Sequence, residues 1–440
     1  MYDSSATSSK YASFTFDTGI IKDSSARFQV NGVALFKDLQ ISNYTVPYLQ
    51  RSTYAATTQI QNCHFTYHTL FLNHFLILFF RTFAGILLST GTGSQITIQD
   101  SSFKSSKIMI SNFMRAANVL ISNTTFQDLV SYSDPNPILS AVNLDSSYIY
   151  VIQDCLFKNI TVATSVLYFT RSAATISLIR LNFQDITRLS MSTFTILQAL
   201  NTDFWGLCVI DQGSTLSIIS SNFTNIPSHC IGLYSSNVFM NDSIFDNSQL
   251  QISSDTSLQA TVPTTFTEKS GISWIIYESI KGLRSEKTLV TLENNQFIEN
   301  KDPPLYGGAF RFIDIATTQL KASGNQFTNN KAYYGGAIYG NGVFFSLNLS
   351  SNTFTGNSAL YGGAIWKNSS ESLLKSYAPS VTISGDIFQQ NTAIENGGAI
   401  FLNWESLALS DAKFLQSQAK IGGAIYFAKL GNDREYFFLC

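Results

Sequence analysis

One short motif, a pair of glycines followed by alanine and then isoleucine or phenylalanine, constrains the fold of this chain more than any other feature. Its copies begin at residues 307, 335, 362, 397 and 422, at intervals of 28, 27, 35 and 25 residues. A motif that returns every roughly 20–50 residues indicates a repeat architecture in which each copy packs on its neighbours. Glycine weakens a strand interior but adopts the positive φ that tight turns need. We therefore predict that these pairs form corners of a repeating coil: Gly307 and Gly308, Gly335 and Gly336, Gly362 and Gly363, Gly397 and Gly398, and Gly422 and Gly423.

A second motif, Phe-x-x-Asn, keeps step with the first. Its phenylalanine precedes each glycine pair by eight to ten residues, and the last copy has lost the asparagine. Apolar and polar residues alternate before each phenylalanine, as in "LNLSSNTF" (347–354), which is typical of a half-buried strand followed by a turn. We expect these phenylalanines to be buried in a stacked column: Phe297, Phe327, Phe354, Phe388 and Phe414.

The repeat therefore consists of a strand, a turn, a buried phenylalanine, a glycine corner and a second strand. No stretch shows a sustained helical period with caps. Short strands of this kind are buried when they wind into coils that stack about 4.8 Å apart. We predict an all-β fold, a right-handed parallel β-helix that forms a single elongated domain with loop insertions.

The first 290 residues keep the strand-turn-Phe half of the pattern, as in "VLISNTTF" (119–126), but lack the glycine pairs. This difference divides the predicted β-helix into parts. They are N-terminal coils at 10–65, an apolar insertion outside the fold at 66–83, degenerate coils at 84–296, motif-bearing coils at 297–428 and a tail at 429–440.

The segment "TLFLNHFLILFFRTFAGILLST" (69–90) interrupts a coil that otherwise reads normally. It is long and apolar enough to suggest a membrane span, but Asn73, His74 and Arg81 lie within it, and an intramembrane arginine is costly. Three interpretations stay open, in order of preference: a non-native insertion such as translated intron sequence, a surface loop or apolar plug, and a true membrane span.

The combined Gly-Gly-Ala-Ile and Phe-x-x-Asn motifs resemble the repeats of the polymorphic outer membrane proteins of chlamydiae and of large pectin-lyase-like surface proteins of ciliated protists. The resemblance is specific over residues 297–426, where both motifs occur, whereas the residues before them keep the strand-turn-Phe unit without the glycine pairs. It implies a right-handed β-helix displayed outside the cell and implicated in adhesion. The bacterial proteins end in a membrane β-barrel, whereas this chain stops at "EYFFLC" and opens without an apolar signal segment. We therefore expect a fragment of a larger membrane-anchored or secreted protein.

Composition and motifs argue against several function classes. The 27 lysines and arginines and 29 acidic residues give a net charge of −2 without a basic patch, so we expect no nucleic-acid partner. Polysaccharide hydrolases need clustered carboxylates, and the match of Asn201-Thr-Asp203 to one of their short motifs stands alone. Asp100, Asp154 and Asp386 are interpreted as turn residues. We predict no catalytic, cofactor or metal site, and hence no enzyme.

The five cysteines are too sparse for a disulfide framework. Cys63 and Cys155 each stand two residues before a coil's phenylalanine, where small residues otherwise stand, so packing is the favoured interpretation. Cys208 and Cys230 lie 22 residues apart, within disulfide reach if they occupy adjacent coils, and their pairing stays open.

The clearest binding candidate is aromatic. Tyr306, Tyr334 and Tyr361 precede the glycine pairs of three successive coils, and such a ladder suits a glycan. A second aromatic column follows the motif, with core stacking as its simpler explanation: Tyr339, Trp366, Phe401 and Tyr426. Alternation places this column opposite the motif isoleucines, which we expect to point inward.

These observations favour a non-enzymatic surface protein on the extracellular face of a cell or membrane, acting in adhesion or as a structural coat. Its expected partners are host-cell, matrix or neighbouring surface proteins or glycans, and its membrane attachment lies outside this chain or at 69–90. The alternative is a β-helix that binds or degrades polysaccharides.

Overall fold

The computed structural model describes most of the chain, and every regular element in the described part is a β-strand. The residues outside the description are 1–11, 23–27, 30–31, 43–49, 53–56, 69–84, 90–93, 107–108, 113–115, 132–138, 143–147, 163–165, 171–174, 189–207, 211–214, 234–236, 253–256, 262–263, 268–271, 276–286, 302–305, 315–316, 343–344, 369–379, 404–405, 429–435 and 440.

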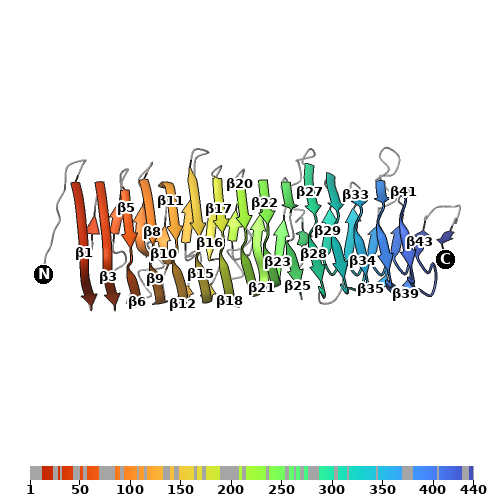
Figure 1. The fold of residues 1–440 in the computed structure, drawn as a ribbon, viewed down its shortest axis with the longest axis horizontal. Coiled ribbons are helices and arrows are strands. Elements are labelled where there is room, and N and C mark those ends of the chain that lie inside the picture. The colour runs from red at the N-terminus through yellow and green to blue at the C-terminus, as the bar shows by residue number, and fades with distance from the viewer. Residues whose placement is uncertain are drawn as a thin grey trace, which may run out of the picture. The chain divides into compact units, whose positions relative to one another are not determined.

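Two compact units, Met1–Gly232 and Leu233–Cys440, make up the chain. Each is a stack of coils in which strands pair in parallel with their counterparts in neighbouring coils (Figure 1). The predicted parallel β-helix is confirmed. The sequence predicted one elongated domain, whereas the contacts between residues divide the chain into two compact units. Such a division fits a repeat protein, because each coil contacts mainly its neighbours.

The first unit has three parallel sheets, named here in chain order. The first sheet contains β5 (Thr57–Gln61), β8 (Ser94–Gln99), β11 (Ala116–Ser122), β14 (Ile149–Gln153), β17 (Thr175–Ile179) and β20 (Thr215–Ile219). The second contains β6 (His64–His68), β9 (Ser102–Ser106), β12 (Thr125–Ser131), β15 (Leu156–Val162), β18 (Asn182–Arg188) and β21 (Asn222–Leu233). The third contains β2 (Phe28–Gln29), β4 (Gln50–Ser52), β7 (Gly85–Ser89), β10 (Met109–Asn112), β13 (Leu139–Val142), β16 (Leu167–Thr170) and β19 (Cys208–Ile210). The long strands β1 (Ala12–Lys22) and β3 (Gly32–Ser42) pair along their length, and β3 pairs onward with both β5 and β6.

The second unit repeats this plan. Its first sheet contains β22 (Asn237–Asn241), β24 (Ser257–Thr261), β27 (Lys287–Glu293), β30 (Thr317–Ser323), β33 (Phe345–Ser350), β37 (Ser380–Ser384) and β41 (Ser406–Ser410). Its second contains β23 (Ile244–Ile252), β25 (Thr265–Thr267), β28 (Gln296–Ile298), β31 (Gln326–Thr328), β34 (Thr353–Thr355), β38 (Ile387–Gln389) and β42 (Lys413–Leu415). Its third contains β26 (Ile272–Ile275), β29 (Phe310–Asp314), β32 (Ile338–Gly342), β36 (Ile365–Asn368), β40 (Ile400–Asn403) and β43 (Ile425–Ala428), with β44 (Tyr436–Leu439) antiparallel to β43. A small parallel pair, β35 (Ser358–Tyr361) and β39 (Thr392–Asn396), lies apart from these sheets.

Parallel register places equivalent residues of successive coils above one another. The phenylalanines of the second sheet therefore stack with ring centroids 4.6–5.2 Å apart in both units. Phe297, Phe327, Phe354 and Phe388 are fully buried, whereas Phe414 in the last motif-bearing coil is half-buried. This column forms the centre of the core.

The asparagine of each Phe-x-x-Asn motif lies in a second buried column, Asn300, Asn330, Asn357 and Asn391. Each of the first three donates its backbone N–H and its side-chain amide to the amide oxygen one coil later, at 2.9–3.1 Å. A buried amide needs such partners, because an unpaired buried polar group costs about 1–3 kcal/mol. The ladder thus fixes the register of successive coils.

The two glycines of each pair serve different purposes, as Gly335 and Gly336 show. Gly335 has a φ of 60°, in the left-handed region that strains other residues. Gly336 has ordinary φ, but a Cβ on it would overlap the carbonyl oxygen of Gly363 in the next coil. The first glycine provides the turn, and the second lets the backbones of neighbouring coils approach closely.

The first three residues of the predicted insertion at 66–83 belong to β6. β6 continues to His68, which pairs with Ser106, and Thr66 pairs with both Ser42 and Lys104. Residues 66–68 therefore belong to the stack, because the alternating pattern of β6 extends past Phe65. Residues 69–84 lie outside the described part, and the chain is again in the stack from Gly85 onward.

Candidate functional site

The tyrosines that precede the glycine pairs form a stacked column on the second unit. Tyr306 pairs in parallel with Tyr334, and Tyr334 pairs with Tyr361, through isolated bridges. Their ring centroids are 5.8 and 5.5 Å apart, with interplanar angles of 11° and 12°. All three side chains are half-buried, so the ring faces meet one another and the ring edges face outward.

The second aromatic column follows the glycine pairs on β32, β36, β40 and β43. Tyr339 and Trp366 stack at 4.7 Å, and Phe401 and Tyr426 continue the column at 6.1 and 5.1 Å. The isoleucines on the opposite side of these strands are buried, as expected: Ile338, Ile365, Ile400 and Ile425. The aromatic column therefore lies outside the core.

The first column covers part of the second. Tyr306 packs on Tyr339 at 4.6 Å, Tyr334 packs on Trp366 at 5.2 Å, and in each case the rings are tilted by about 50°. This cover explains why Tyr339 is only 3% exposed although its strand directs it away from the core. The two columns form one layered aromatic surface.

Cations lie at the N-terminal end of this surface. Arg311 on β29 stands in register with Tyr339, and its guanidinium carbon lies 5.0 Å from the centre of the Tyr306 ring. Its Nε atom is buried and has no hydrogen-bond partner in the described structure. Lys301 and Lys331 are both exposed and pair with each other through an isolated bridge.

The sequence analysis missed these cations, although the repeats contain the signal. Arg311 follows "GGAF" where later coils carry Tyr339, Trp366, Phe401 or Tyr426. The two lysines each follow a motif asparagine directly, in "FIENK" and "FTNNK". Aligning the coils position by position shows both features.

A shallow groove of about 390 Å³ lies elsewhere on the second unit, over the outer face of β27, β30, β33 and β37. Glu293 and Lys321 are the only titratable side chains in its lining. Acid–base cleavage of a glycosidic bond uses two carboxyl groups, and this lining supplies one. Hydroxyl and amide groups make up most of the remaining polar lining: Thr291, Ser323, Asn348, Ser350, Thr382 and Ser384.

The aspartates interpreted as turn residues have two different environments. Asp100 and Asp154 are turn residues with φ of 51° and 55°. Asp386 instead is fully buried and accepts hydrogen bonds from the backbone and side-chain amides of Asn352 at 2.8 and 2.7 Å. Burial raises the pKa of Asp386 despite these bonds. Asp386 lies with Gly385 in the turn between β37 and β38, at the position that Asn352 fills one coil earlier, so it is a turn residue whose carboxyl group is buried.

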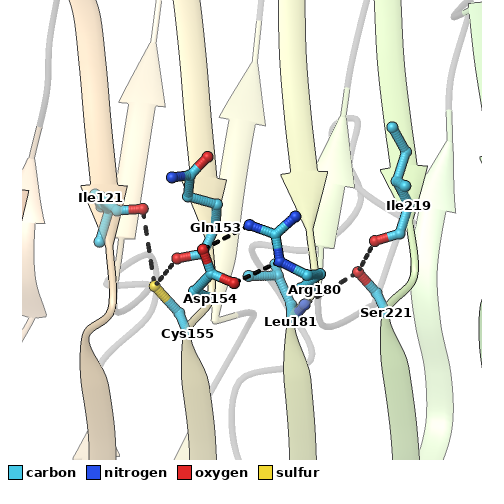
Figure 2. A network of polar contacts seen from close by, with 8 residues as sticks. All are labelled: Ile121, Gln153, Asp154, Cys155, Arg180, Leu181, Ile219 and Ser221. Atoms are coloured by element: carbon cyan, nitrogen blue, oxygen red, sulfur yellow. Dashed lines mark hydrogen bonds and ion pairs between the residues drawn. The ribbon is translucent and has the colours of Figure 1, made fainter.

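Figure 2 shows one such turn in the first unit. Outside the coil, Nε and Nη2 of Arg180 donate to Oδ1 and Oδ2 of Asp154. This ion pair lowers the pKa of Asp154. Inside, the thiol of Cys155 donates to the carbonyl oxygen of Gln153 at 3.1 Å, and burial raises its pKa to about 12. Serine and threonine make the same bond in other coils, namely Ser101, Thr124, Ser221 and Ser243. Cys155 is therefore a packing residue at a corner.

Several predicted features lie outside the described residues, including Asn201-Thr-Asp203 and most of 69–90. The side chains of Cys208 and Cys230 do as well, so their pairing stays open. The described part of the chain contains no group of three histidine, cysteine or acidic side chains placed to hold a metal ion. No helix among the described residues is both long and apolar enough to span a bilayer.

Comparison with known families agrees with this architecture. Residues 205–377 match the family described as the right handed beta helix region, which establishes the handedness of the coils. Residues 387–403 match the Chlamydia polymorphic membrane protein repeat, and this segment contains both Phe388-x-x-Asn391 and Gly397-Gly-Ala-Ile400. The predicted resemblance is confirmed. The matched segments cover less than half of the chain, and no curated protein or solved structure matches it.

Proposed function

We propose that this chain is part of a surface-displayed, non-enzymatic β-helix protein that acts in adhesion or as a structural coat. The match of residues 387–403 to the polymorphic membrane protein repeat carries the proposal. Its partners are then proteins or glycans of a host cell, the matrix or a neighbouring surface.

The use of recurrent residues within the coils supports a scaffold role. The motif asparagines bind the next coil, the phenylalanines stack, and the glycines admit close backbone contacts. Residues that repeat once per coil are thus explained by stability, and none of them needs a catalytic role. The groove on the first sheet adds a single carboxylate, Glu293.

Surface labelling of the full-length gene product tests this proposal. Antibodies against the purified chain should stain intact cells, and external protease should remove the signal. A cytoplasmic protein of the same cells, which must stay unlabelled, is the control for leakage. Staining that requires permeabilised cells would overturn the proposal.

Polysaccharide cleavage is the rival function, and the same purified protein tests it. Incubation with pectin-like polymers should release neither reducing ends nor unsaturated sugars. Sustained release of either product, lost on Glu293→Gln, would show that the groove is an active site and would contradict the non-enzymatic assignment.

A further inference from the structure

The N-terminal end of the layered aromatic surface has the chemistry of an anion-binding site. We propose that a patch formed by Lys301, Lys331, Arg311, Tyr306, Tyr333 and Tyr334 binds a linear anionic polysaccharide. The inference deepens the proposed function and rests on it, because such a polymer would be met outside the cell.

Three cations of the described structure, Lys301, Lys331 and Arg311, gather here without an ion-pair partner among the described residues. Lys301 and Lys331 are exposed and directly paired between coils, an arrangement of like charges that is unfavourable in the free protein. None of the ion pairs among the described residues involves them or Arg311. A polyanion would relieve their repulsion.

The described carboxylates nearest to the patch form no ion pair with these cations, and Asp302, which follows Lys301, lies outside the described residues. Glu299 precedes Lys301 by two residues, but it is an exposed turn residue with φ of 54°, separated from the lysine by the buried Asn300. Glu395 lies two coils further on and is paired with Lys420 at 3.3 Å. The described residues of the patch therefore carry positive charge, although the whole chain has a net charge of −2.

The aromatic residues add neutral hydrogen-bond donors. Burial and the hydroxyl groups of Tyr333, Tyr361 and Tyr306 raise the pKa of Tyr334, so its phenol keeps its proton at physiological pH. Face-to-face stacking occupies the rings of the column, so a sugar cannot lie flat on Tyr334. Tyr333 is different, because it is 41% exposed and meets Tyr334 edge-on. It is the ring most accessible to a ligand.

Arg311 suits a planar acidic group. Its guanidinium is held against the Tyr306 ring, and a fixed planar fork binds carboxylate or sulfate through two parallel hydrogen bonds.

The spacing of the patch favours a polysaccharide over a peptide. Successive tyrosines are 5.5–5.8 Å apart over three coils, and the lysine recurs in two of these coils, at Lys301 and Lys331. An extended peptide presents side chains on one face about every 6.6 Å, which is two residues at roughly 3.3 Å each, and falls out of step over three coils. In a polysaccharide with an acidic group on each sugar, by contrast, the acidic group recurs at every ring and not at every second residue.

Titration of the purified full chain with defined polymers tests the inference. Probes are heparin as a sulfated polymer, polygalacturonate as a carboxylated polymer, neutral dextran, and poly-glutamate as an acidic peptide. We expect saturable, salt-sensitive binding of heparin or polygalacturonate, none of dextran, and weaker binding of poly-glutamate. The double variant Lys301→Gln, Lys331→Gln should reduce affinity about tenfold, since exposed charges act weakly one by one. Tyr333→Ser should reduce it further.

Lys321→Gln is the matched control, because this lysine is exposed on the groove face of the same unit. It should bind as the unaltered protein does, and all variants should show the same thermal unfolding. Equal loss in the control, no saturable binding of either anionic polysaccharide, or poly-glutamate binding as tightly as both would overturn the inference. Surface staining is measured separately, so a stained protein without polymer binding refutes this site and leaves surface display intact.

Discussion

Replacement of Asn330 by alanine tests whether the buried asparagine ladder holds the coils together. Asn330 donates its side-chain amide to Phe297 O at 3.0 Å and to Asn357 Oδ1 at 2.9 Å. Its own Oδ1 accepts the backbone and side-chain amides of Asn300 at 3.0 and 2.9 Å. The variant keeps the backbone N–H of residue 330 and removes the other contacts.

The magnitude follows from the groups left behind. The carbonyl of Phe297 and the two amide groups of Asn300 lose the partner that Asn330 provides, and each such loss costs about 1–3 kcal/mol when buried. A water entering the space of the deleted amide would pair with some of them. We therefore expect the free energy of unfolding to fall by about 3–5 kcal/mol, a large part of the roughly 5–15 kcal/mol of a typical domain.

Urea unfolding followed by circular dichroism measures the loss. Asn348→Ala is the matched control, because Asn348 points outward on β33 in the adjacent coil, and its removal should cost no more than about 0.5 kcal/mol. Hydrogen exchange should show the largest loss of protection in the coils that flank residue 330, since repeats couple mainly to neighbours. A loss below about 1 kcal/mol for Asn330→Ala would refute the ladder argument.

Three further predictions concern single sites. Gly336→Ala should destabilise the second unit by about 2 kcal/mol or more in the same urea assay, because the new methyl group meets the Gly363 carbonyl; an unchanged midpoint would contradict this. Asp386→Asn should stabilise the protein at neutral pH. Because the pKa of Asp386 is raised in the folded state, the folded protein keeps this proton to higher pH than the unfolded chain does. The free energy of unfolding therefore falls as pH rises from the ordinary aspartate pKa through the raised pKa. Above the raised pKa it stays at the lower value. The gain of the variant over the unaltered protein in urea should therefore grow with pH, and a gain that is constant or shrinks would disprove the assignment. Cys155 should resist thiol reagents at pH 8 while folded and react on unfolding, because burial raises its pKa to about 12; rapid labelling of the native protein at this residue would show that the corner is open.

The motif residues made most of the fold predictable. Gly335, Phe327 and Asn330 recur because each occupies a position that only one or two residue types satisfy: a left-handed turn, a ring stack and an amide ladder. Such strict positions appear in a sequence as exact repeats. The first unit is harder to read because its corner position accepts serine, threonine or cysteine, all of which make the same short bond to a carbonyl.

Asp386 shows that the exact position of a turn residue within the repeat decides its environment. Exchange between the nearly isosteric aspartate and asparagine leaves the side chain outside the coil at the turns of Asp100 and Asp154, where it contacts Asn123 or Arg180. At Asp386 the same exchange buries a carboxyl group at the end of an amide ladder, where it accepts the donors of Asn352. The distance to the following phenylalanine separates these environments, because Asp100 and Asp154 stand three residues before it whereas Asp386 stands two before it, as Asn352 does.

The candidate site was partly predictable for a related reason. Tyr306 and Tyr334 repeat with the coils and were visible as a ladder, whereas Arg311, Lys301 and Lys331 occur at positions that later coils fill differently. Regularity is what a β-helix needs for stacking, so strictly repeated residues report on stability. Departures from the repeat at outward positions add nothing to the stack, and they are the positions free to recognise a ligand. The basic residues of the patch are such departures, and our proposal accordingly places ligand recognition at the layered aromatic surface, away from the ladders that stabilise the second unit.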